Sequence, residues 1–254
     1  MNSVAAFDWG SVPFGPDVHL LRAHASGLAA LDKPAGVLSH PNKPGEEPRS
    51  LLNARYDEKE QCFVWKTPDG AERRVWLLHR LDSATSGLVL VAARSQTAAA
   101  VREAFELRQV HKRYVAVVLG HTRERQAHWR DALEVRREAG AVRATTRGGA
   151  PAETAMRCLR PIPGPPALSV LQLEPLTGRT HQLRVQCARR HLPILGDQNY
   201  GDFKRNRDLA RRFGTDRLFL HARDVELEFP LEGGRVRFAA ESPLPAEFRA
   251  FLKS

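Results

Sequence analysis

The stretch HRLDSATSG (His79–Gly87) separates the apolar pair Leu77-Leu78 from the apolar run GLVLVAA (Gly87–Ala93). A short run of branched apolar residues is typical of a buried β-strand. Asp, Ser and Thr side chains favour turns, so the chain enters this strand from a polar loop that contains Asp82. A loop that emerges from a rigid apolar base can present a carboxylate for chemistry. Residue types alone nevertheless favour a simple turn without a chemical role.

A second polar stretch, GRTHQLR (Gly178–Arg184), leads into a segment whose apolar spacing predicts a helix over residues 180–191. PILGDQNYG (Pro193–Gly201) follows it. The junction gathers two arginines, a histidine and a glutamine, and this density of hydrogen-bond donors indicates contacts to anions or nucleic acid. A cap on the helix end explains the same residues more simply.

The remaining apolar segments predict many strands and few helices. Strands are expected at 28–38, 112–120, 168–173, 218–229 and 235–240, with further short strands between 133 and 159. Helical spacing favours helices over 95–109 and 245–253. This pattern indicates an α+β fold built on a large mixed, mainly antiparallel sheet flanked by helices and loops.

No repeat and no clear linker divides the chain, so one domain is expected over residues 25–254. Residues 1–24 show little periodicity and are interpreted as a loosely ordered arm. Residues 41–74 are polar and rich in Pro, Lys and Glu, and they are interpreted as a surface excursion from that domain. The excursion is expected to contain a short helix near 50–56 and a hairpin turn at Pro68-Asp69-Gly70.

The charge balance favours a polyanionic partner. Within 254 residues, 39 Lys and Arg oppose 29 Asp and Glu, which gives a formal net charge of +10. Basic runs lie at Lys204–Arg212 and Arg108–Arg113. Such charge speeds the encounter with nucleic acid, although a solvated basic surface is the alternative. No apolar run reaches the roughly 18 to 20 residues of a membrane span, and no signal peptide is recognisable, so a cytoplasmic protein is expected.

The sequence offers no ligand set for a metal or a nucleotide cofactor. Cys62, Cys158 and Cys187 are widely spaced without a C-x-x-C pair, which argues against disulfides and zinc. The glycine-rich phosphate and dinucleotide loops, H-E-x-x-H and G-x-S-x-G are absent from the sequence. We therefore expect no cofactor and no metal.

Six segments occur together in one order: LDKPAG, HRLDSATSG, KRYVAVVLG, GRTHQLRVQCA, PILGDQNYG and LHA. With this combination the chain resembles, from Leu28 to Phe238, the RluA family of RNA pseudouridine synthases. The resemblance implies the pseudouridine synthase catalytic fold and a cofactor-free isomerisation of specific uridines in tRNA, large-subunit rRNA or both. The chain looks like the compact form of the family, because the short segment before LDKPAG leaves no room for the N-terminal accessory RNA-binding domain of some relatives.

The resemblance also implies roles for single residues. Asp82 matches the essential catalytic aspartate. Arg184 matches the arginine expected to pair with Asp82 and keep it ionised, with a surface phosphate contact as the alternative. Tyr114 matches a tyrosine expected to stack on uracil and assist loss of the carbon-5 proton, or it packs at the core edge. Arg80 matches the residue expected to fill the space that the extruded uridine leaves.

Other members of these motifs are expected around the substrate or beneath it. Leu183 contacts the uracil or packs below it, and Arg179, His181 and Gln182 are placed around the site. Lys33 matches a motif that is expected to be structural. RNA is the expected partner, and the protein is expected to be a monomer.

Two other functions fit less well. A non-catalytic RNA-binding module with the same fold would not need Asp82, Tyr114 and Arg184 together. A metal-dependent nuclease that uses Asp82 and Asp197 would need clustered carboxylates, which the sequence does not show.

Overall fold

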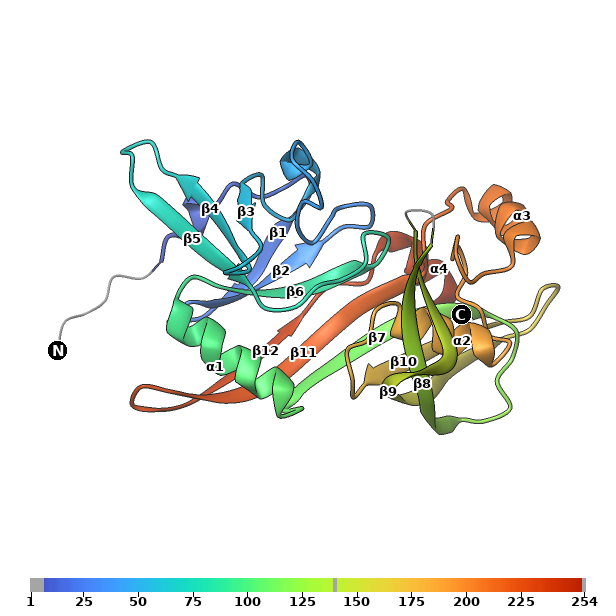
Figure 1. The fold of residues 1–254 in the computed structure, drawn as a ribbon. Coiled ribbons are helices and arrows are strands. Elements are labelled where there is room, and N and C mark those ends of the chain that lie inside the picture. The colour runs from blue at the N-terminus through green and yellow to red at the C-terminus, as the bar shows by residue number, and fades with distance from the viewer. Residues whose placement is uncertain (1–6, 139–140, 253–254) are drawn as a thin grey trace. The chain divides into compact units, whose positions relative to one another are not determined.

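The computed structural model describes residues 7–138 and 141–252, and Figure 1 shows their elements coloured along the chain. The strands are β1 (His19–Ala23), β2 (Leu28–Lys33), β3 (Arg55–Asp57), β4 (Cys62–Lys66), β5 (Glu72–Leu77), β6 (Ser86–Ala92), β7 (Val110–Leu119), β8 (Gln126–Glu138), β9 (Ala141–Ile162), β10 (Leu168–Pro175), β11 (Leu220–Leu231) and β12 (Gly234–Glu241). The helices are α1 (Ser95–Glu106), α2 (Gln182–Arg189), α3 (Phe203–Phe213) and α4 (Ala246–Leu252), with short 3-10 helices η1 (Trp9–Ser11) and η2 (Glu47–Arg49). In these ranges no helix is long and apolar enough to cross a membrane.

The chain forms two compact units. Unit 1 comprises Met1–Val110 and Asp224–Ser242, and unit 2 comprises His111–Arg223 and Pro243–Ser254. The chain passes between them three times: inside β7, inside β11, and after β12 between Ser242 and Pro243. Because two of these passages lie inside strands, the sequence shows no clear linker between the units, and it therefore predicted one domain over residues 25–254.

In unit 1 the strand order is β3-β4-β5-β6-β11, with β2 also paired to β6, β1 to β2 and β12 to β11. The registers determined within this unit are antiparallel. Ala98, Val101 and Ala104 of α1 are buried in one cluster with residues of β2, β6, β11 and β12. The helix predicted over residues 95–109 is thus confirmed as α1. Because β6 is buried along its whole length, the loop before it ends on a rigid strand.

In unit 2 the strand order is β7-β10-β9-β8, again with antiparallel registers. Val185 of α2 is buried with Leu133 and Ala152, which lie on β8 and β9. The predicted helix over 180–191 is confirmed as α2. The long strand β9 takes in two strands that the sequence predicted separately.

The predicted loosely ordered arm is wrong for residues 7–24, and residues 1–6 lie outside the described residues. Trp9, Val12 and Val18 are buried, and β1 pairs with β2. Asp8 caps η1 by accepting from the N–H of Gly10 at 2.9 Å. These apolar residues are buried singly, so the sequence lacks the periodic spacing from which a helix or strand is predicted.

The interpretation of residues 41–74 as a surface excursion is also corrected. Leu51, Leu52 and Phe63 are fully buried, and strands β3, β4 and β5 extend the sheet of unit 1. The short helix expected near 50–56 is absent, because this described segment runs into β3, and only η2 precedes it. The hairpin turn at 68–70 is confirmed by a hydrogen bond of 2.8 Å from the N–H of Gly70 to the carbonyl of Thr67.

Candidate active site

The loop that contains Asp82 joins β5 to β6. The N–H of Leu78 donates to the carbonyl of Leu90 at 3.1 Å, and the N–H of Leu90 donates to Nε2 of His79 at 3.0 Å. The N–H of Thr85 donates to the carbonyl of Asp82 at 3.0 Å, which closes the turn that residue types predict. Asp82 itself is half-buried, so the loop holds its side chain at a partly accessible position.

Lys33 stabilises this loop from inside unit 1. Its side chain is fully buried. Its Nζ donates to the carbonyls of Pro34, Val37 and Ser83 at 3.0, 2.7 and 3.1 Å. A buried ammonium group is tolerated only when hydrogen bonds replace its hydration, and these three carbonyls do so. Lys33 thereby fixes the residue that directly follows Asp82.

Two successive residues before the excursion hold two successive residues of HRLD. Ser39 Oγ donates to the carbonyl of Leu81 at 2.8 Å and accepts from the N–H of Leu81 at 3.0 Å. Nη1 of Arg80 lies 2.8 Å from Nε2 of His40. The Arg80 side chain is exposed, and an exposed arginine is usually mobile. The contact with His40 gives its guanidinium a defined position.

The His40 ring is held on two sides. Its Nδ1 lies 2.9 Å from the carbonyl of Pro41, which can only accept, so the ring proton is assigned to Nδ1 and Nε2 accepts from Arg80. The ring stacks on Tyr56, with centroids 4.6 Å apart and planes inclined by 13°, and Tyr56 packs edge-on against Phe63. Burial raises the pKa of Tyr56 to about 12, although the charge of Arg80 lowers it in part. Sequence reasoning missed this support because it treated the segment after His40 as surface.

In unit 2, Gln182 fixes the start of α2. Its Oε1 accepts from Thr177 Oγ1 at 2.7 Å and from the N–H of Arg179 at 3.1 Å. Its Nε2 donates to the carbonyl of Glu153 at 2.9 Å and to Thr154 Oγ1 at 3.0 Å. A carboxamide offers two acceptor and two donor positions, and the protein itself uses all four. Gln182 is thus a buried residue that holds the start of α2, and its expected contact with substrate stays a prediction.

Arg184, two residues further along α2, forms a buried ion pair with Asp197. Its Nε and Nη2 donate to the two carboxylate oxygens at 2.8 Å each, and the side chains are 7% and 1% exposed. One of these oxygens also accepts from the N–H groups of Asn199 and Tyr200. Burial raises the pKa of Asp197, but the bonds and charge of Arg184 and the two N–H groups outweigh it and hold that pKa below its ordinary value. The sequence did not predict this pairing.

The other residues of GRTHQLR surround the same corner of unit 2. His181 has a left-handed backbone with φ of 55°, and its Nδ1 lies 2.9 Å from the Tyr200 hydroxyl. The Arg184 guanidinium lies over the Tyr200 ring at 5.3 Å. Arg179 is exposed, and its Nε donates to the carbonyl of Pro151 at 3.2 Å. His181, Arg184 and Tyr200 thus form one connected group at the start of α2.

Leu183 and Tyr114 are buried on α2 and β7. Tyr114 lies opposite Leu173 in the register of β7 with β10. Burial fits the packing alternative considered for both residues, and their contact with uracil stays a prediction.

The predicted residues are divided between the units. Asp82 and Arg80 belong to unit 1, whereas Tyr114 and Arg184 belong to unit 2. Within each unit the structure brings the members of a motif together, and the pairing of Asp82 with Arg184 stays a prediction from the sequence.

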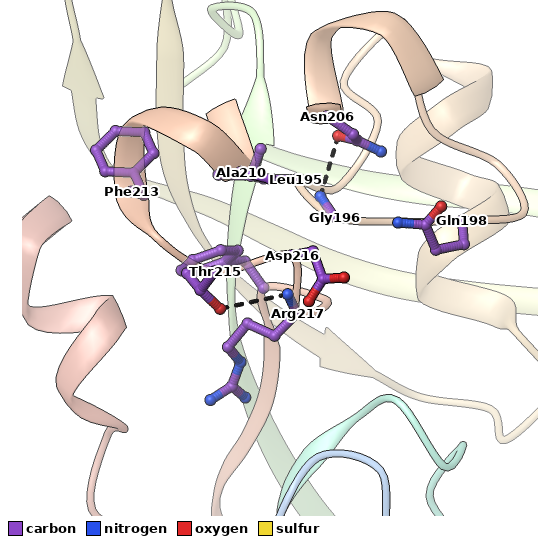
Figure 2. A pocket seen from close by; sticks show the side chains of 10 residues that line it. Leu195, Gly196, Gln198, Asn206, Ala210, Phe213, Thr215, Asp216 and Arg217 are labelled. Atoms are coloured by element: carbon purple, nitrogen blue, oxygen red, sulfur yellow. Dashed lines mark hydrogen bonds between the residues drawn. The ribbon is translucent and has the colours of Figure 1, made fainter. Parts of the chain in front are cut away.

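A small cavity lies in unit 2 between Leu195-Gly196, α3 and the segment 215–217, as Figure 2 shows. At its wall the N–H of Gly196 donates to Oδ1 of Asn206 at 3.1 Å. Its volume of about 10 Å³ accommodates about one water molecule. The cavity is therefore too small for a uracil ring.

The structure argues against the metal-dependent nuclease, because Asp197 is not available as a metal ligand. This carboxylate is engaged by Arg184 and by two backbone N–H groups. In residues 7–138 and 141–252, no three His, Cys, Asp or Glu side chains are grouped so that they could hold a metal ion.

Comparison with known proteins decides the family. A model described as RNA pseudouridylate synthase matches residues 27–189, a range that contains HRLD, Tyr114 and GRTHQLR. The chain belongs to the RNA pseudouridylate synthase family. The predicted family and enzyme class, an isomerase that acts on RNA, are thereby confirmed.

Several curated relatives have the printed name tRNA pseudouridine synthase C. The protein of that name from Pectobacterium carotovorum subsp. carotovorum is 34% identical over 228 residues, which cover 86% of this chain and 57% of the relative. The protein from Yersinia pestis is 34% identical over 223 residues, which cover 84% of this chain and 82% of the relative. The chain therefore spans little more than half of the first relative and most of the second.

Two solved human structures share the fold. RNA Pseudouridylate Synthase Domain Containing 1 superposes with a TM-score of 0.65 at 23% identity, covering 90% of this chain and 84% of that one. RNA Pseudouridylate Synthase Domain Containing 4 gives a TM-score of 0.64 at 24% identity, covering 92% and 91%. At these identities the likeness shows the fold alone.

Proposed function

We propose that this RNA pseudouridylate synthase family member converts one or more specific uridines of tRNA to pseudouridine, with Asp82 as the catalytic residue. The observation that carries the proposal is the clamp on the Asp82 loop. Ser39 binds the residue before Asp82, and Lys33 binds the residue after it. A carboxylate that acts on one bond needs such preorganisation.

The reaction exchanges a carbon–nitrogen bond for a carbon–carbon bond. The bond between uracil N1 and ribose C1′ breaks, the uracil turns, C5 bonds to C1′, the C5 proton leaves and N1 gains a proton. Atoms and electrons balance without a co-reactant. Asp82 acts either as a nucleophile, which splits one difficult step into two, or by stabilising and deprotonating a glycal-like intermediate.

Three further side chains complete the proposed machinery. Arg184 pairs with the Asp82 carboxylate, and because Asp197 fixes the Arg184 guanidinium, that charge is rigidly placed. Tyr114 stacks on the uracil and assists loss of the C5 proton. Arg80 fills the space that the extruded nucleotide leaves, which offsets part of the few kcal/mol that extrusion costs.

The residues around this machinery line the uracil in our proposal. Leu183 packs against the base, and His181 and Arg179 lie beside it. Gln182 stays a predicted neighbour of the substrate and also holds the start of α2.

The names of the relatives support tRNA as the substrate, and large-subunit rRNA stays within the proposed range. The formal charge of +10 fits an RNA substrate, because it speeds encounter with a polyanion. We further propose that the protein acts as a monomer in the cytoplasm.

Tritium release tests the substrate class. Total tRNA and, separately, rRNA are prepared from cells that lack the protein, with tritium at uracil C5. Release from tRNA on addition of the protein is expected. Tritium release from rRNA alone would identify rRNA, not tRNA, as the substrate. No release from either RNA would contradict the proposed activity.

The same assay separates the enzyme from a non-catalytic RNA-binding module. A module would bind tRNA without releasing tritium, and its Asp82→Asn variant would behave like the wild type in every measurement.

A further inference from the structure

Helix α3 carries five cationic side chains and one acidic side chain in eleven residues. The helix begins after Asp202, whose side chain accepts from the N–H of Arg205 at 3.0 Å, and it ends at Gly214, which has a φ of 68°. The cations are Lys204, Arg205, Arg207, Arg211 and Arg212. None of the roles assigned above uses them.

One face of α3 packs against unit 2. Asn206, Ala210 and Phe213 are spaced by four and three residues, so they share a face, and Figure 2 shows them around the small cavity. Asn206 is buried, and the Phe213 ring packs on Phe251 with centroids 4.8 Å apart. This packing fixes the rotation of α3 about its axis.

A different face carries exposed cations. Lys204, Arg207 and Arg211 are spaced by three and four residues, so they lie together on a side of α3 that the packed residues leave open. Arg211 lies 3.7 Å from Asp208 in an exposed ion pair, which neutralises it only weakly. Lys204 and Arg207 have no acidic partner among the described residues of the chain.

Helix stability accounts for only some of these cations. Cations at the last turn of a helix favour the macrodipole, which explains Arg211 and Arg212. Lys204 and Arg205 lie in the first turn, where a positive charge opposes the macrodipole. Arg205 is compensated by an ion pair with the N-cap residue Asp202, whose Oδ2 lies 3.4 Å from the Arg205 Nε. Helix stability therefore does not explain Lys204.

An exposed aromatic ring lies at the edge of the same face. Phe203 is 54% exposed, and Arg207 follows it four residues later, one helical turn away. Aromatic rings beside cations are the pattern with which proteins stack unpaired bases and hold the adjoining backbone. The chemistry of this face therefore fits a nucleic acid better than an acidic protein.

The helix is tied to the corner that holds Arg184. Nδ2 of Asn206 donates to the carbonyl of Asp197 at 3.0 Å, and Asp197 is the ion-pair partner of Arg184. A Cβ at Gly201 would lie 2.3 Å from the same carbonyl, so only glycine fits the turn that leads into α3. The cationic face thus has a fixed position relative to this corner of unit 2.

We propose that α3 binds the phosphate backbone of the substrate RNA outside the target nucleotide. Lys204 and Arg207 contact phosphates, and Phe203 stacks on an unpaired base. The proposal rests on the proposed function only in that the substrate is RNA.

The first experiment compares two variants that lose the same charge. Lys204→Ala/Arg207→Ala removes two cations from α3, and alanine preserves the helix. Arg235→Ala/Arg237→Ala removes two cations from β12 in unit 1, where these side chains are 69% and 86% exposed. Circular dichroism and thermal unfolding establish that both variants are folded before binding is measured.

Binding of labelled total tRNA is measured at several salt concentrations. The α3 variant is expected to bind roughly tenfold more weakly, and the slope of log K against log salt is expected to fall by about 1.4 to 1.8. Its KM is expected to rise while kcat at saturating tRNA is unchanged. The β12 variant is expected to stay within about twofold of the wild type, because exposed charges more than about a Debye length from the bound RNA are largely screened.

Phe203 is tested separately. Phe203→Ala is expected to weaken binding without changing the salt slope, and Phe203→Trp is expected to restore it, because stacking releases no counterions. A loss with Phe203→Trp as large as that with Phe203→Ala would contradict the stacking role.

Equal losses of affinity in the α3 and β12 variants, or an unchanged salt slope in the α3 variant, would overturn the proposal. These outcomes are distinguishable from a failure of the proposed function. If the wild type releases no tritium but the α3 variant alone binds weakly, the isomerase assignment to tRNA fails and the surface stands. If the wild type is active and the two variants match, the surface alone fails.

Discussion

The guanidinium of Arg184 grips the Asp197 carboxylate with two bonds of 2.8 Å, and the side chains are almost completely buried. Asp197 also connects to α3, since Asn206 donates to its carbonyl. Asp197 therefore connects the group of His181, Arg184 and Tyr200 at the start of α2 to helix α3, which carries the cationic face. The same pair explains how unit 2 tolerates a buried arginine charge.

Breaking this pair from one side is expected to destabilise the protein. Asp197→Asn keeps the size of the side chain but leaves Arg184 buried without a counter-charge, so the free energy of unfolding should fall by about 3 to 5 kcal/mol. Urea unfolding at pH 7 measures it. Asp208→Asn, at an exposed carboxylate of α3, is the control and should change stability by less than about 0.5 kcal/mol. Similar losses in both variants would refute the buried pair as a stabilising feature.

Lys112 predicts a pH dependence of stability. Burial lowers the pKa of Lys112 to about 8. In the unfolded chain the value is about 10.4, so between these two pH values the unfolded chain holds a proton that the folded chain has lost. Stability contributed by this group therefore rises with pH across that window. Relative to Lys112→Met, the wild type should gain about 2 kcal/mol between pH 7 and pH 10. Parallel stability curves for the two proteins would contradict this.

The ring of His40 is expected to matter through the acceptor it offers to Arg80. His40→Phe keeps an aromatic ring on Tyr56 but removes the acceptor, and kcat/KM for tRNA should fall roughly tenfold. His40→Gln retains an acceptor and should recover most of that activity. Tyr56→Phe, which keeps the ring that stacks on His40, is the matched control and should resemble the wild type. Equal activity of the Phe and Gln variants at position 40 would show that the hydrogen bond between His40 and Arg80 does not contribute to activity.

Lys33 is expected to act on Asp82 through the backbone. Lys33→Met leaves the buried carbonyl of Val37 and the part-buried carbonyls of Pro34 and Ser83 without their donor, so both stability and kcat should fall, with roughly 1 to 3 kcal/mol lost for each carbonyl that stays buried and unsatisfied. Thermal unfolding and tritium release follow the two effects. Lys59→Met, at an exposed lysine, should leave both unchanged.

Much of the fold could be predicted because its signals are local. The apolar run of β6 and the spacing in α1 and α2 are visible within one element, and the structure has them at the expected places. Strands β3 to β5 were missed because β3 has only three residues, β5 begins with three exposed charged residues, and the buried Leu51 and Leu52 lie outside these strands. Helix α3 was missed because it has no clear apolar stripe: among its described packed residues, Asn206, Ala210 and Phe213, one is polar, and five cations lie between and beside them.

The candidate site was predictable in its motifs but not in its supports. Asp82, Arg80 and Arg184 are found from patterns that extend over a few residues. Their supports, His40 for Arg80 and Asp197 for Arg184, lie 40 and 13 positions away, and no spacing rule connects them. Gln182 shows a further limit, since the motif places it around the substrate but does not reveal the four hydrogen bonds with which it holds the start of α2.

The most direct test of the central claim compares wild type, Asp82→Asn and Asp82→Glu for tritium release from tRNA labelled at uracil C5, with tRNA binding measured on the same proteins. The wild type should release tritium, and Asp82→Asn should release none while binding tRNA within severalfold of the wild type. Asp82→Glu keeps the charge but displaces the carboxylate by one methylene, so it should be strongly impaired. Substantial release by Asp82→Asn would contradict the assignment of Asp82 as the catalytic residue.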